Sequence, residues 1–291
     1  MTIHRNDTFL AWLKSLFSGQ VYSVEKLTGD AGFRHYSRIN FAHSSYIAVD
    51  AEPSKSNNHA FVQISEALNK ASINAPKVIH REDTQGFYCL SDLGSCLLSD
   101  LANSDNMPVL YQRAIDTLIR MLSISHIPNY ELPDYDADFV AMELAIFPEW
   151  LLSQHLNIHL DETEKQQLTA CFEVLINNAI EQPKYFMHRD YHSRNIMLND
   201  QQDIAVIDFQ DAVRGPISYD VVSLLRDCYI QWPDTSVDKM FNYFKVEVTK
   251  KFDLKIENAV WQRWFDLMGI QRHIKASGIF ARLHHRDGKN V

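Results

Sequence analysis

The stretch His188-Arg189-Asp190-Tyr191-His192-Ser193-Arg194-Asn195 decides how this chain is interpreted, and Asp208-Phe209 follows it after an apolar segment. The stretch has the pattern H-x-D-x-x-x-x-N, and Asp208 comes thirteen positions after Asn195. Phosphoryl transfer needs a base for the proton of the attacking hydroxyl and oxygen ligands for magnesium. Asp190 suits the base, whereas Asn195 and Asp208 carry the hard oxygen donors that Mg²⁺ prefers. The spacing therefore predicts a phosphotransferase site with Asp190 as catalytic base and Asn195 and Asp208 as metal ligands.

The first ninety residues favour β-structure with one or two helices, and the chain after them favours helices. Apolar alternation predicts strands at 21–27, 35–41, 46–49 and 87–90, and helical spacing predicts helices at 9–17 and 61–70. After a polar break at 91–94, helices are predicted at 109–125, 139–155, 163–180, 219–229 and 261–283, with hairpin strands at 195–198 and 204–207. Asp161 followed by Glu164 predicts a capping box at the third of these helices. We therefore expect an α+β, bilobal protein with a small β-rich N-terminal lobe, residues 1–93, and a larger, mainly helical C-terminal lobe, residues 94–291.

Composition excludes several classes of protein. Hydrophobic residues make up 46% of the 291 residues and charged residues 22%, the balance of an ordinary globular protein. The formal net charge is −9, from 28 basic and 37 acidic residues, which argues against general nucleic-acid binding. No apolar run approaches the roughly 20 residues that span a bilayer, and the polar start lacks a signal sequence. We expect a cytoplasmic monomer without a membrane, nucleic-acid or obligatory protein partner.

The four cysteines show no C-x-x-C pair and lie in apolar periodic segments. They are Cys89, Cys96, Cys171 and Cys228. Buried free thiols in a reducing compartment are the favoured interpretation, over a disulfide or a metal site.

The chain resembles the aminoglycoside-phosphotransferase branch of the protein-kinase-like superfamily over essentially its whole length. His192 extends the motif to H-x-D-x-H-x-x-N, whereas relatives that phosphorylate proteins usually carry a Leu-Lys pair after the Asp. The segment between Asp208 and Asp220 is short and is not followed by an A-P-E triplet, so little room remains for an activation loop. The resemblance implies a protein-kinase-like fold, and these two features favour a small-molecule acceptor over a peptide.

A narrower resemblance rests on four strings: GDAGFRHYSRI, HRDYHSRN, VIDFQDAVRGPISYDVVSLLRDCYI and MGIQRHIKASGIFARL. They are similar to the anomeric N-acetylmuramate/N-acetylglucosamine kinases of bacterial cell-wall recycling. This resemblance implies phosphorylation of a sugar C1 hydroxyl with ATP and Mg²⁺. Kinases for aminoglycosides or other small alcohols share the catalytic residues and remain alternatives. A nucleotide-binding pseudokinase module is a lesser one.

The expected nucleotide site departs from the general kinase pattern on the third strand. Gly29, Asp30, Ala31 and Gly32 lie between two predicted strands, where backbone N–H groups could cover phosphates. A Lys is expected near 46–50 but absent, which leaves Arg34, Arg38, or metal and backbone alone to hold the phosphates; the pairing role of Glu66 is equally open. The resemblance implies that the hinge, with Ser91 and Leu93, offers backbone groups to adenine.

Candidates for sugar contact and for support of the loop are less specific. The sugar candidates carry carboxylates, guanidinium groups or aromatic faces, and each is also compatible with a role in the core or on a helix surface. They are Asp211, Glu143, Trp150 and Arg226, and in addition Tyr135, Asp136, Phe147, Trp232 and Arg272. His188 and His192 are expected to support Asp190. Asp220 is expected to cap an apolar helix and brace the catalytic loop.

Overall fold

The computed structural model describes residues 3–27, 33–199 and 203–288. The chain divides into two compact units. One consists of Met1–Ser95, Ile127–Tyr130 and Met197–Gln210, and we call it the sheet unit. The other, here the helical unit, consists of Cys96–His126, Glu131–Ile196 and Asp211–Val291. The predicted α+β class is confirmed, because the first unit holds a five-stranded sheet and the second is mainly helical.

The sheet unit is built on an antiparallel sheet with strand order β1-β2-β3-β5-β4. Its strands are β1 (Ser23–Lys26), β2 (Arg34–Asn40), β3 (Ser45–Ala51), β4 (Val78–Glu82) and β5 (Phe87–Ser91). β4 was not predicted, because its sequence Val-Ile-His-Arg-Glu does not alternate between apolar and polar residues and its three central residues are exposed. Of the three inner strands, β3 and β5 are more buried than β2.

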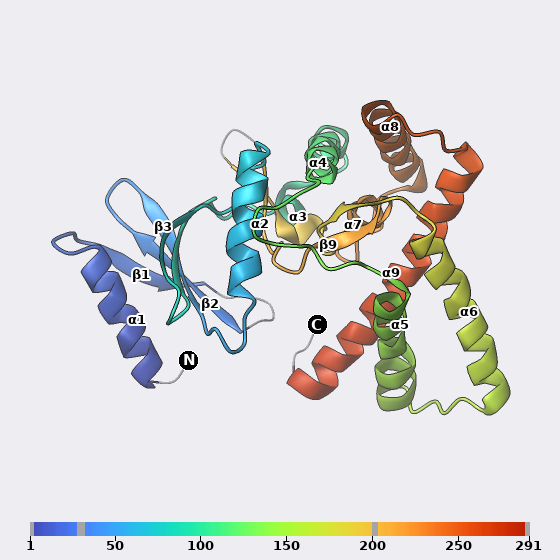
Figure 1. Ribbon diagram of the computed structural model, residues 1–291, viewed down its shortest axis with the longest axis horizontal. Coiled ribbons are helices and arrows are strands. Elements are labelled where there is room, and N and C mark those ends of the chain that lie inside the picture. Colours follow the sequence, from blue (N-terminus) through green and yellow to red (C-terminus); the bar gives the residue numbers. More distant parts are fainter. Residues whose placement is uncertain (1–2, 28–32, 200–202, 289–291) are drawn as a thin grey trace. The chain divides into compact units, whose positions relative to one another are not determined.

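Helices α1 (Ile3–Leu16) and α2 (Asn58–Lys70) cover opposite faces of this sheet (Figure 1). Phe9 and Leu13 of α1 share one apolar cluster with Phe87 of β5. Phe61 of α2 instead contacts Tyr88, the next residue of β5, with ring centroids 6.3 Å apart. Successive residues of a strand point to opposite faces, so the two helices enclose the sheet.

The hairpin β7 (Ile196–Leu198) and β8 (Ile204–Val206) joins the sheet unit through the segment after α2. The Val206 N–H donates to the Asn74 carbonyl at 2.8 Å, and the Asn74 amide nitrogen lies 3.3 Å from the Ile204 carbonyl. Residues 197–210 therefore belong with the sheet although the chain reaches them from the helical unit. A single boundary between residues 93 and 94 does not account for the grouping of residues 197–210 with the sheet unit.

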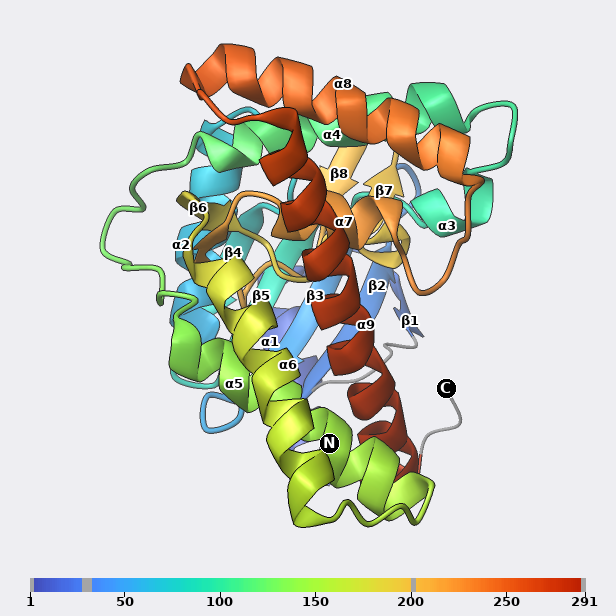
Figure 2. The same ribbon diagram turned by 90° about the vertical axis from the view of Figure 1, so that its right-hand side faces the viewer.

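The helical unit packs its helices around the long helix α9 (Asn258–Asp287), which contacts α5, α6, α7 and the π-helix η1 (Figure 2). The other elements are α3 (Leu98–Leu101), α4 (Met107–Leu122), α5 (Ala137–Ile146), η1 (Phe147–His155), α6 (Glu162–Ile180), α7 (Tyr219–Leu225) and α8 (Asp234–Phe252), with a short sheet of β6 (Lys184–Met187) and β9 (Val213–Pro216). The predicted capping box at Asp161 and Glu164 is confirmed at α6.

The predicted helix at 139–155 is two helices of different type, because α5 ends at Ile146 and continues as η1. Gly278 of α9 lies against this junction: a Cβ there would come within 2.8 Å of the Phe147 nitrogen. The close approach of the two backbones requires glycine at this crossing.

The four cysteines are free, but the prediction that all are buried is wrong. Cys89 lies within the sheet, and burial raises the pKa of its thiol to about 11. Cys96, Cys171 and Cys228 are exposed. Cys171 lies on α6, of which only Leu175, Asn178 and Ala179 are buried, so the apolar pattern around it does not mark a core face.

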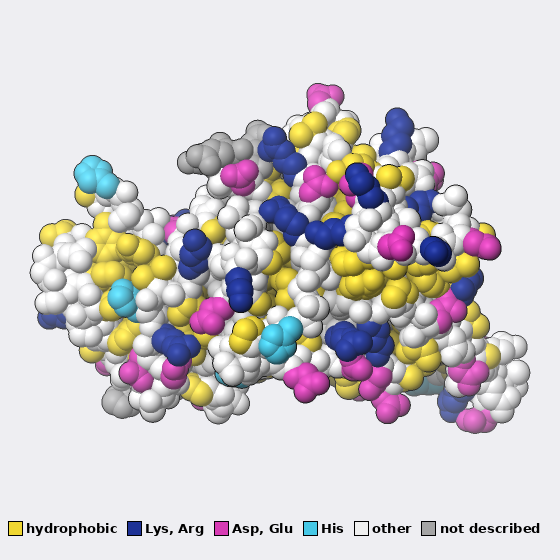
Figure 3. Space-filling view, turned by 45° about the horizontal axis from the view of Figure 1, so that its top comes forward, with side chains coloured by type: hydrophobic (Ala, Val, Ile, Leu, Met, Phe, Trp, Pro, Cys, Tyr) yellow, Lys and Arg dark blue, Asp and Glu magenta, His cyan; other side chains and the backbone are white. Residues whose placement is uncertain are grey.

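Charges of both signs share the surface. On the face drawn in Figure 3, Lys and Arg side chains lie among Asp and Glu side chains. In the described part of the chain, no helix combines the length and the apolar character needed to cross a membrane.

Candidate active site

The loop His188–Asn195 leaves β6 and is anchored by a carboxylate of α7. Asp220 is buried; one of its oxygens accepts the His188 N–H at 2.6 Å and the other the Arg189 N–H at 3.1 Å. Ser218, not Asp220, is the N-cap of α7, so the predicted capping role is wrong. Asp220 instead braces the loop by satisfying two consecutive backbone N–H groups.

The residue before the expected base has a strained backbone. Arg189 has φ = +76°, a left-handed conformation that costs a non-glycine residue about 1 kcal/mol or more. Its carbonyl accepts a hydrogen bond from Arg272 at 3.1 Å, and its guanidinium binds Glu143 at 2.7 Å. These contacts at both ends of Arg189 hold the strained turn in a single conformation.

Asp190 and Asn195 close the loop on each other. The Asn195 amide nitrogen donates to the Asp190 carbonyl at 3.0 Å and lies 3.4 Å from His192 Nε2. The Asp190 N–H donates to Nδ1 of the buried His188 at 3.3 Å. Because the amide nitrogen of Asn195 faces the loop, its oxygen is the atom suited to a metal.

The charges around Asp190 keep its carboxyl group ionised. Burial raises the pKa of Asp190, but Lys275, Arg189, His192 and Arg272 lower it, and the net shift is downward. A base must be deprotonated before it can accept a proton. The environment of Asp190 meets this requirement at neutral pH.

A buried charge network lies behind the loop and includes Glu143, a predicted sugar contact. Its carboxylate is 5% exposed and binds Lys275 of α9 at 2.8 Å and Arg189 at 2.7 Å. The Tyr135 hydroxyl donates to its second oxygen at 2.7 Å, and Lys275 also donates to the Tyr219 hydroxyl at 3.0 Å. Both oxygens of Glu143 are engaged inside the protein, so the interpretation as a sugar contact is corrected to a support of the loop.

Removing the Lys275 cation should destabilise this unit strongly. We expect Lys275→Met to lower the free energy of unfolding by about 3 kcal/mol, because the buried Glu143 loses a compensating charge. Denaturant unfolding measures the change. Lys165→Met, in an exposed pair with Glu162, should show no measurable loss. If both variants unfold alike, the network does not stabilise the fold.

Three further predicted sugar contacts of the helical unit differ in what they touch. Arg226 binds Asp266 at 2.6 Å and lies over the Phe265 ring, and Trp150 is half-buried on η1. Asp211 is exposed, and its carbonyl accepts from Arg189 at 3.3 Å. Of these three, only Asp211 contacts the catalytic loop.

In the sheet unit, Asp208 and Arg34 lie near the same aromatic pair. Phe209 stacks on Phe61 with ring centroids 5.2 Å apart, and the Arg34 guanidinium carbon lies 5.3 Å from the Phe61 centroid. Asp208 is exposed, has φ = +63°, and accepts from the Gln210 amide at 2.8 Å. Burial raises the pKa of Tyr36 to about 12, with Arg34 lowering and Asp208 raising it. A cation and a carboxylate thus share one region of this unit.

The two arginines considered as substitutes for the missing Lys have different environments. Arg38 binds Asp92 at 2.6 Å and donates to the Gly94 carbonyl at 2.7 Å, so it holds the hinge and is removed as a phosphate candidate. Arg34 remains. On the third strand itself, Asp50 is buried and paired with Arg5 of α1. Glu66 is exposed on α2, as a solvated helix charge would be.

The hinge residues differ in what they can offer. The Ser91 N–H donates to the Lys77 carbonyl and the Ser91 hydroxyl accepts from the Lys77 N–H, both at 2.9 Å. The Ser91 N–H is therefore already engaged, and the offer of other backbone groups of Ser91 and Leu93 to adenine stays a prediction. Gly29, Asp30, Ala31 and Gly32 lie outside the described residues.

Lys275 and Gln271 are buried polar residues that we did not predict. Both lie on α9, four positions apart and hence on one face. Gln271 donates to the Tyr135 hydroxyl at 2.9 Å, which extends the network. A Lys on an otherwise apolar helix face is the sequence signal that could have identified Lys275 as a buried, paired residue.

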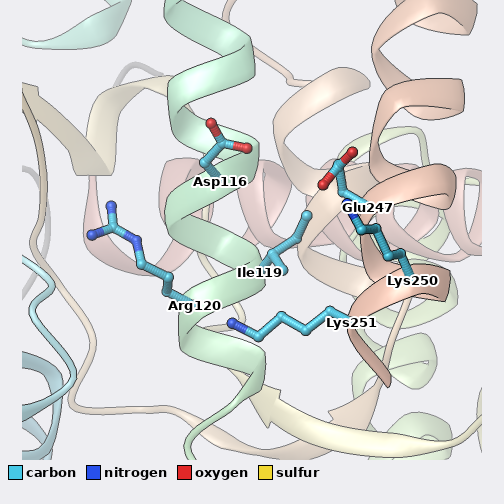
Figure 4. Close-up of a pocket in the computed structure, with 6 residues that line it drawn as sticks. All are labelled: Asp116, Ile119, Arg120, Glu247, Lys250 and Lys251. Atoms are coloured by element: carbon cyan, nitrogen blue, oxygen red, sulfur yellow. The ribbon is translucent and has the colours of Figure 1, made fainter. Parts of the chain in front are cut away.

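A separate hollow lies on the helical unit between α4 and α8 (Figure 4). It is lined by Asp116, Ile119, Arg120, Glu247, Lys250 and Lys251, and Lys251 points toward α4. Asp116 accepts a hydrogen bond from the Tyr243 hydroxyl at 2.6 Å. None of the predicted site residues lines this hollow.

The braced H-x-D-x-H-x-x-N loop and the sheet-and-helix architecture define a kinase-like phosphotransferase. The chain belongs to the phosphotransferase enzyme family, whose model matches residues 23–245. This confirms the family and the enzyme class predicted from the motifs.

Relatives from two bacteria match most of the chain. An N-acetylmuramate/N-acetylglucosamine kinase of Pseudomonas putida is 36% identical over 269 residues, which is 92% of this chain and 78% of the relative. A kinase with the same name from Pseudomonas aeruginosa is 36% identical over 93% of this chain and 80% of the relative.

Solved structures share the fold at low sequence identity. A Plasmodium vivax ethanolamine kinase superposes with a TM-score of 0.65 at 12% identity, covering 91% of this chain and 77% of that one. The ADP-bound aminoglycoside phosphotransferase APH(2'')-Ib gives 0.59 at 14% identity, covering 92% and 98%. Kinases of this family use a nucleotide as phosphoryl donor.

Proposed function

We propose that this protein is an ATP-dependent sugar kinase that phosphorylates the anomeric hydroxyl of N-acetylmuramate and N-acetylglucosamine. The observation that carries the proposal is the 36% identity to a kinase of that name over 92% of the chain. An anomeric hydroxyl is more acidic than other sugar hydroxyls, so a carboxylate of low pKa such as Asp190 is a sufficient base.

In the proposed reaction, Asp190 accepts the proton of the C1 hydroxyl while the C1 oxygen of the sugar bonds to the γ-phosphorus. The bond from that phosphorus to the β-phosphate oxygen breaks, and ADP leaves without a covalent enzyme intermediate. Asp220 and Asn195 act on the loop backbone and hold Asp190 in place. Arg34 is the cation we assign to the phosphates.

Asn195 and Asp208 would hold Mg²⁺. In the described part of the chain, no group of three or more His, Cys, Asp and Glu side chains could hold a metal ion by itself. Mg²⁺ usually takes one or two protein ligands and completes its shell with phosphate oxygens and water. An amide and a carboxylate oxygen are donors of the kind that Mg²⁺ prefers, and the metal would neutralise phosphate charge.

The test is ADP release from ATP and Mg²⁺ with N-acetylmuramate, N-acetylglucosamine, kanamycin, choline or no acceptor. We expect turnover with the amino sugars and loss of their reducing end, because phosphorylation blocks C1. Turnover with kanamycin or choline alone would make the chain a kinase of another small alcohol. Absence of ADP release with every acceptor would favour a non-catalytic nucleotide-binding module.

The assignment of Arg34 has its own test. We expect Arg34→Ala to raise the KM for ATP roughly tenfold, the loss of one charge-assisted contact. Arg81→Ala, at an exposed Arg of β4, is the matched control. A KM for ATP equal to that of the control would end the idea that Arg34 replaces the missing Lys.

A further inference from the structure

Arg194, four residues after Asp190, lies on an aromatic ring at the edge of the catalytic loop. Its side chain is exposed, and its guanidinium carbon lies 4.0 Å from the ring centroid of Tyr229. Tyr229 belongs to the connection between α7 and α8 (Figure 2) and is itself 36% exposed. A surface-accessible Arg–Tyr stack is thus part of the loop that carries the base.

This stack is fixed to the catalytic loop by a single carboxylate. One oxygen of Asp227 accepts the Ser193 N–H at 2.9 Å, and the other accepts the Tyr229 N–H at 3.0 Å. The Tyr229 ring also meets the His192 ring edge-on, with centroids 5.1 Å apart. These contacts attach Tyr229, and the guanidinium that lies on it, to the catalytic loop.

The backbone of Arg194 also lies in the same turn as that of Asp190. Asn195, the neighbour of Arg194, donates to the Asp190 carbonyl, so the loop turns back on itself between the two residues. Asp190 and Arg194 therefore belong to one turn of the loop, which Asp220 binds before Asp190 and Asp227 binds before Arg194.

A guanidinium stacked on a ring is well suited to a carboxylate. Stacking uses the flat face, while the N–H groups lie in the guanidinium plane and form a fork that matches two carboxylate oxygens. The ring also restricts the side chain in advance, which lowers the entropy cost of binding. An anionic acceptor must approach the negative Asp190 and the nucleotide phosphates, and a nearby cation offsets that repulsion.

We propose that Arg194, held by Tyr229, binds the carboxylate of an acidic acceptor sugar, the lactyl carboxylate of N-acetylmuramate. The inference rests on the proposed function and deepens it, because N-acetylglucosamine lacks this lactyl group. Arg194 is then the residue that distinguishes the two acceptors.

The experiment compares kcat/KM for N-acetylmuramate, its lactyl methyl ester and N-acetylglucosamine. We expect wild-type protein to prefer the acid over the ester by about tenfold or more, the value of one charge-assisted pair. In Arg194→Met this preference should fall to near one, and the preference over N-acetylglucosamine should fall by the same factor. Arg194→Lys, which keeps the charge without the fork, should retain only part of it. Arg263→Met, at an exposed Arg of α9, should keep the wild-type ratios.

The outcomes separate this inference from the function on which it rests. If wild type uses acid and ester equally, or if Arg194→Met slows all three sugars by one factor, Arg194 is only a brace of the loop. Tyr229→Leu gives a second test, with a smaller loss of the same ratio expected, in case Arg194→Met does not fold. If wild type phosphorylates none of the sugars, the proposed function and this inference fail together.

Discussion

Asp190→Asn should lower kcat by about 100-fold or more, the usual contribution of a positioned general base. The amide has nearly the shape of the carboxylate but does not take up the proton of the acceptor hydroxyl. The loop itself should persist, since its contacts at Asp190 involve the backbone N–H and carbonyl. Nucleotide binding is therefore expected to remain near wild type.

Two measurements test the assignment of Asp190. Turnover is followed with saturating ATP and acceptor, and ADP affinity is determined by calorimetry. Asp116→Asn, in the hollow between α4 and α8, is a matched control and should keep normal kcat. Near-normal turnover of Asp190→Asn would remove the base assignment, and loss of ADP binding would indicate collapse of the loop.

The fold class could be predicted because its determinants are local. Strand and helix periods are visible within windows of about ten residues, and the catalytic pattern occupies eight consecutive positions. The elements that were missed lack such signals. β4 does not alternate between apolar and polar residues, and the partners β6 and β9 are separated by the catalytic loop and the β7–β8 hairpin.

The partners of the catalytic loop could not be predicted, because they come from distant segments. Glu143 and Lys275 meet across 132 positions, and neither residue type alone indicates burial. Asp220 was assigned to a helix end on local grounds, but its oxygens face a loop about thirty residues earlier. Such pairings follow from tertiary packing, which one sequence does not specify at the level of individual side chains.

The corrected interpretations share one physical cause. Glu143 was predicted to contact sugar, Arg38 was one alternative for the phosphates, and the hinge backbone was predicted to meet adenine. Glu143, Arg38 and the Ser91 N–H are each engaged by an internal partner. A buried charge or N–H group requires such a partner, so a polar residue in a plausible position is often already satisfied. The stacking of Arg194 on Tyr229 was not predicted, because an exposed Arg and an exposed Tyr look ordinary in a sequence.

Loss of the carboxylate at Asp208 should abolish the magnesium-dependent part of nucleotide affinity. Mg²⁺ requires oxygen donors, and Asp208 is the only carboxylate that we assign to it, so Asp208→Ala leaves the Asn195 amide alone. Metal-free ADP binding should change little. Calorimetric titration of ADP with and without Mg²⁺ separates the two contributions, and Asp203→Ala on the same hairpin is the control.

Because Asp208 has a left-handed backbone conformation, a second variant is needed. With φ = +63°, alanine is strained there by about 1 kcal/mol, whereas asparagine tolerates the left-handed conformation. Asp208→Asn therefore removes the charge while keeping the turn, and it should also lose most of the gain in affinity from Mg²⁺. If Asp208→Ala loses that gain and Asp208→Asn keeps it, the effect is one of backbone strain. If both variants bind Mg²⁺–ADP like wild type, Asp208 is not a metal ligand.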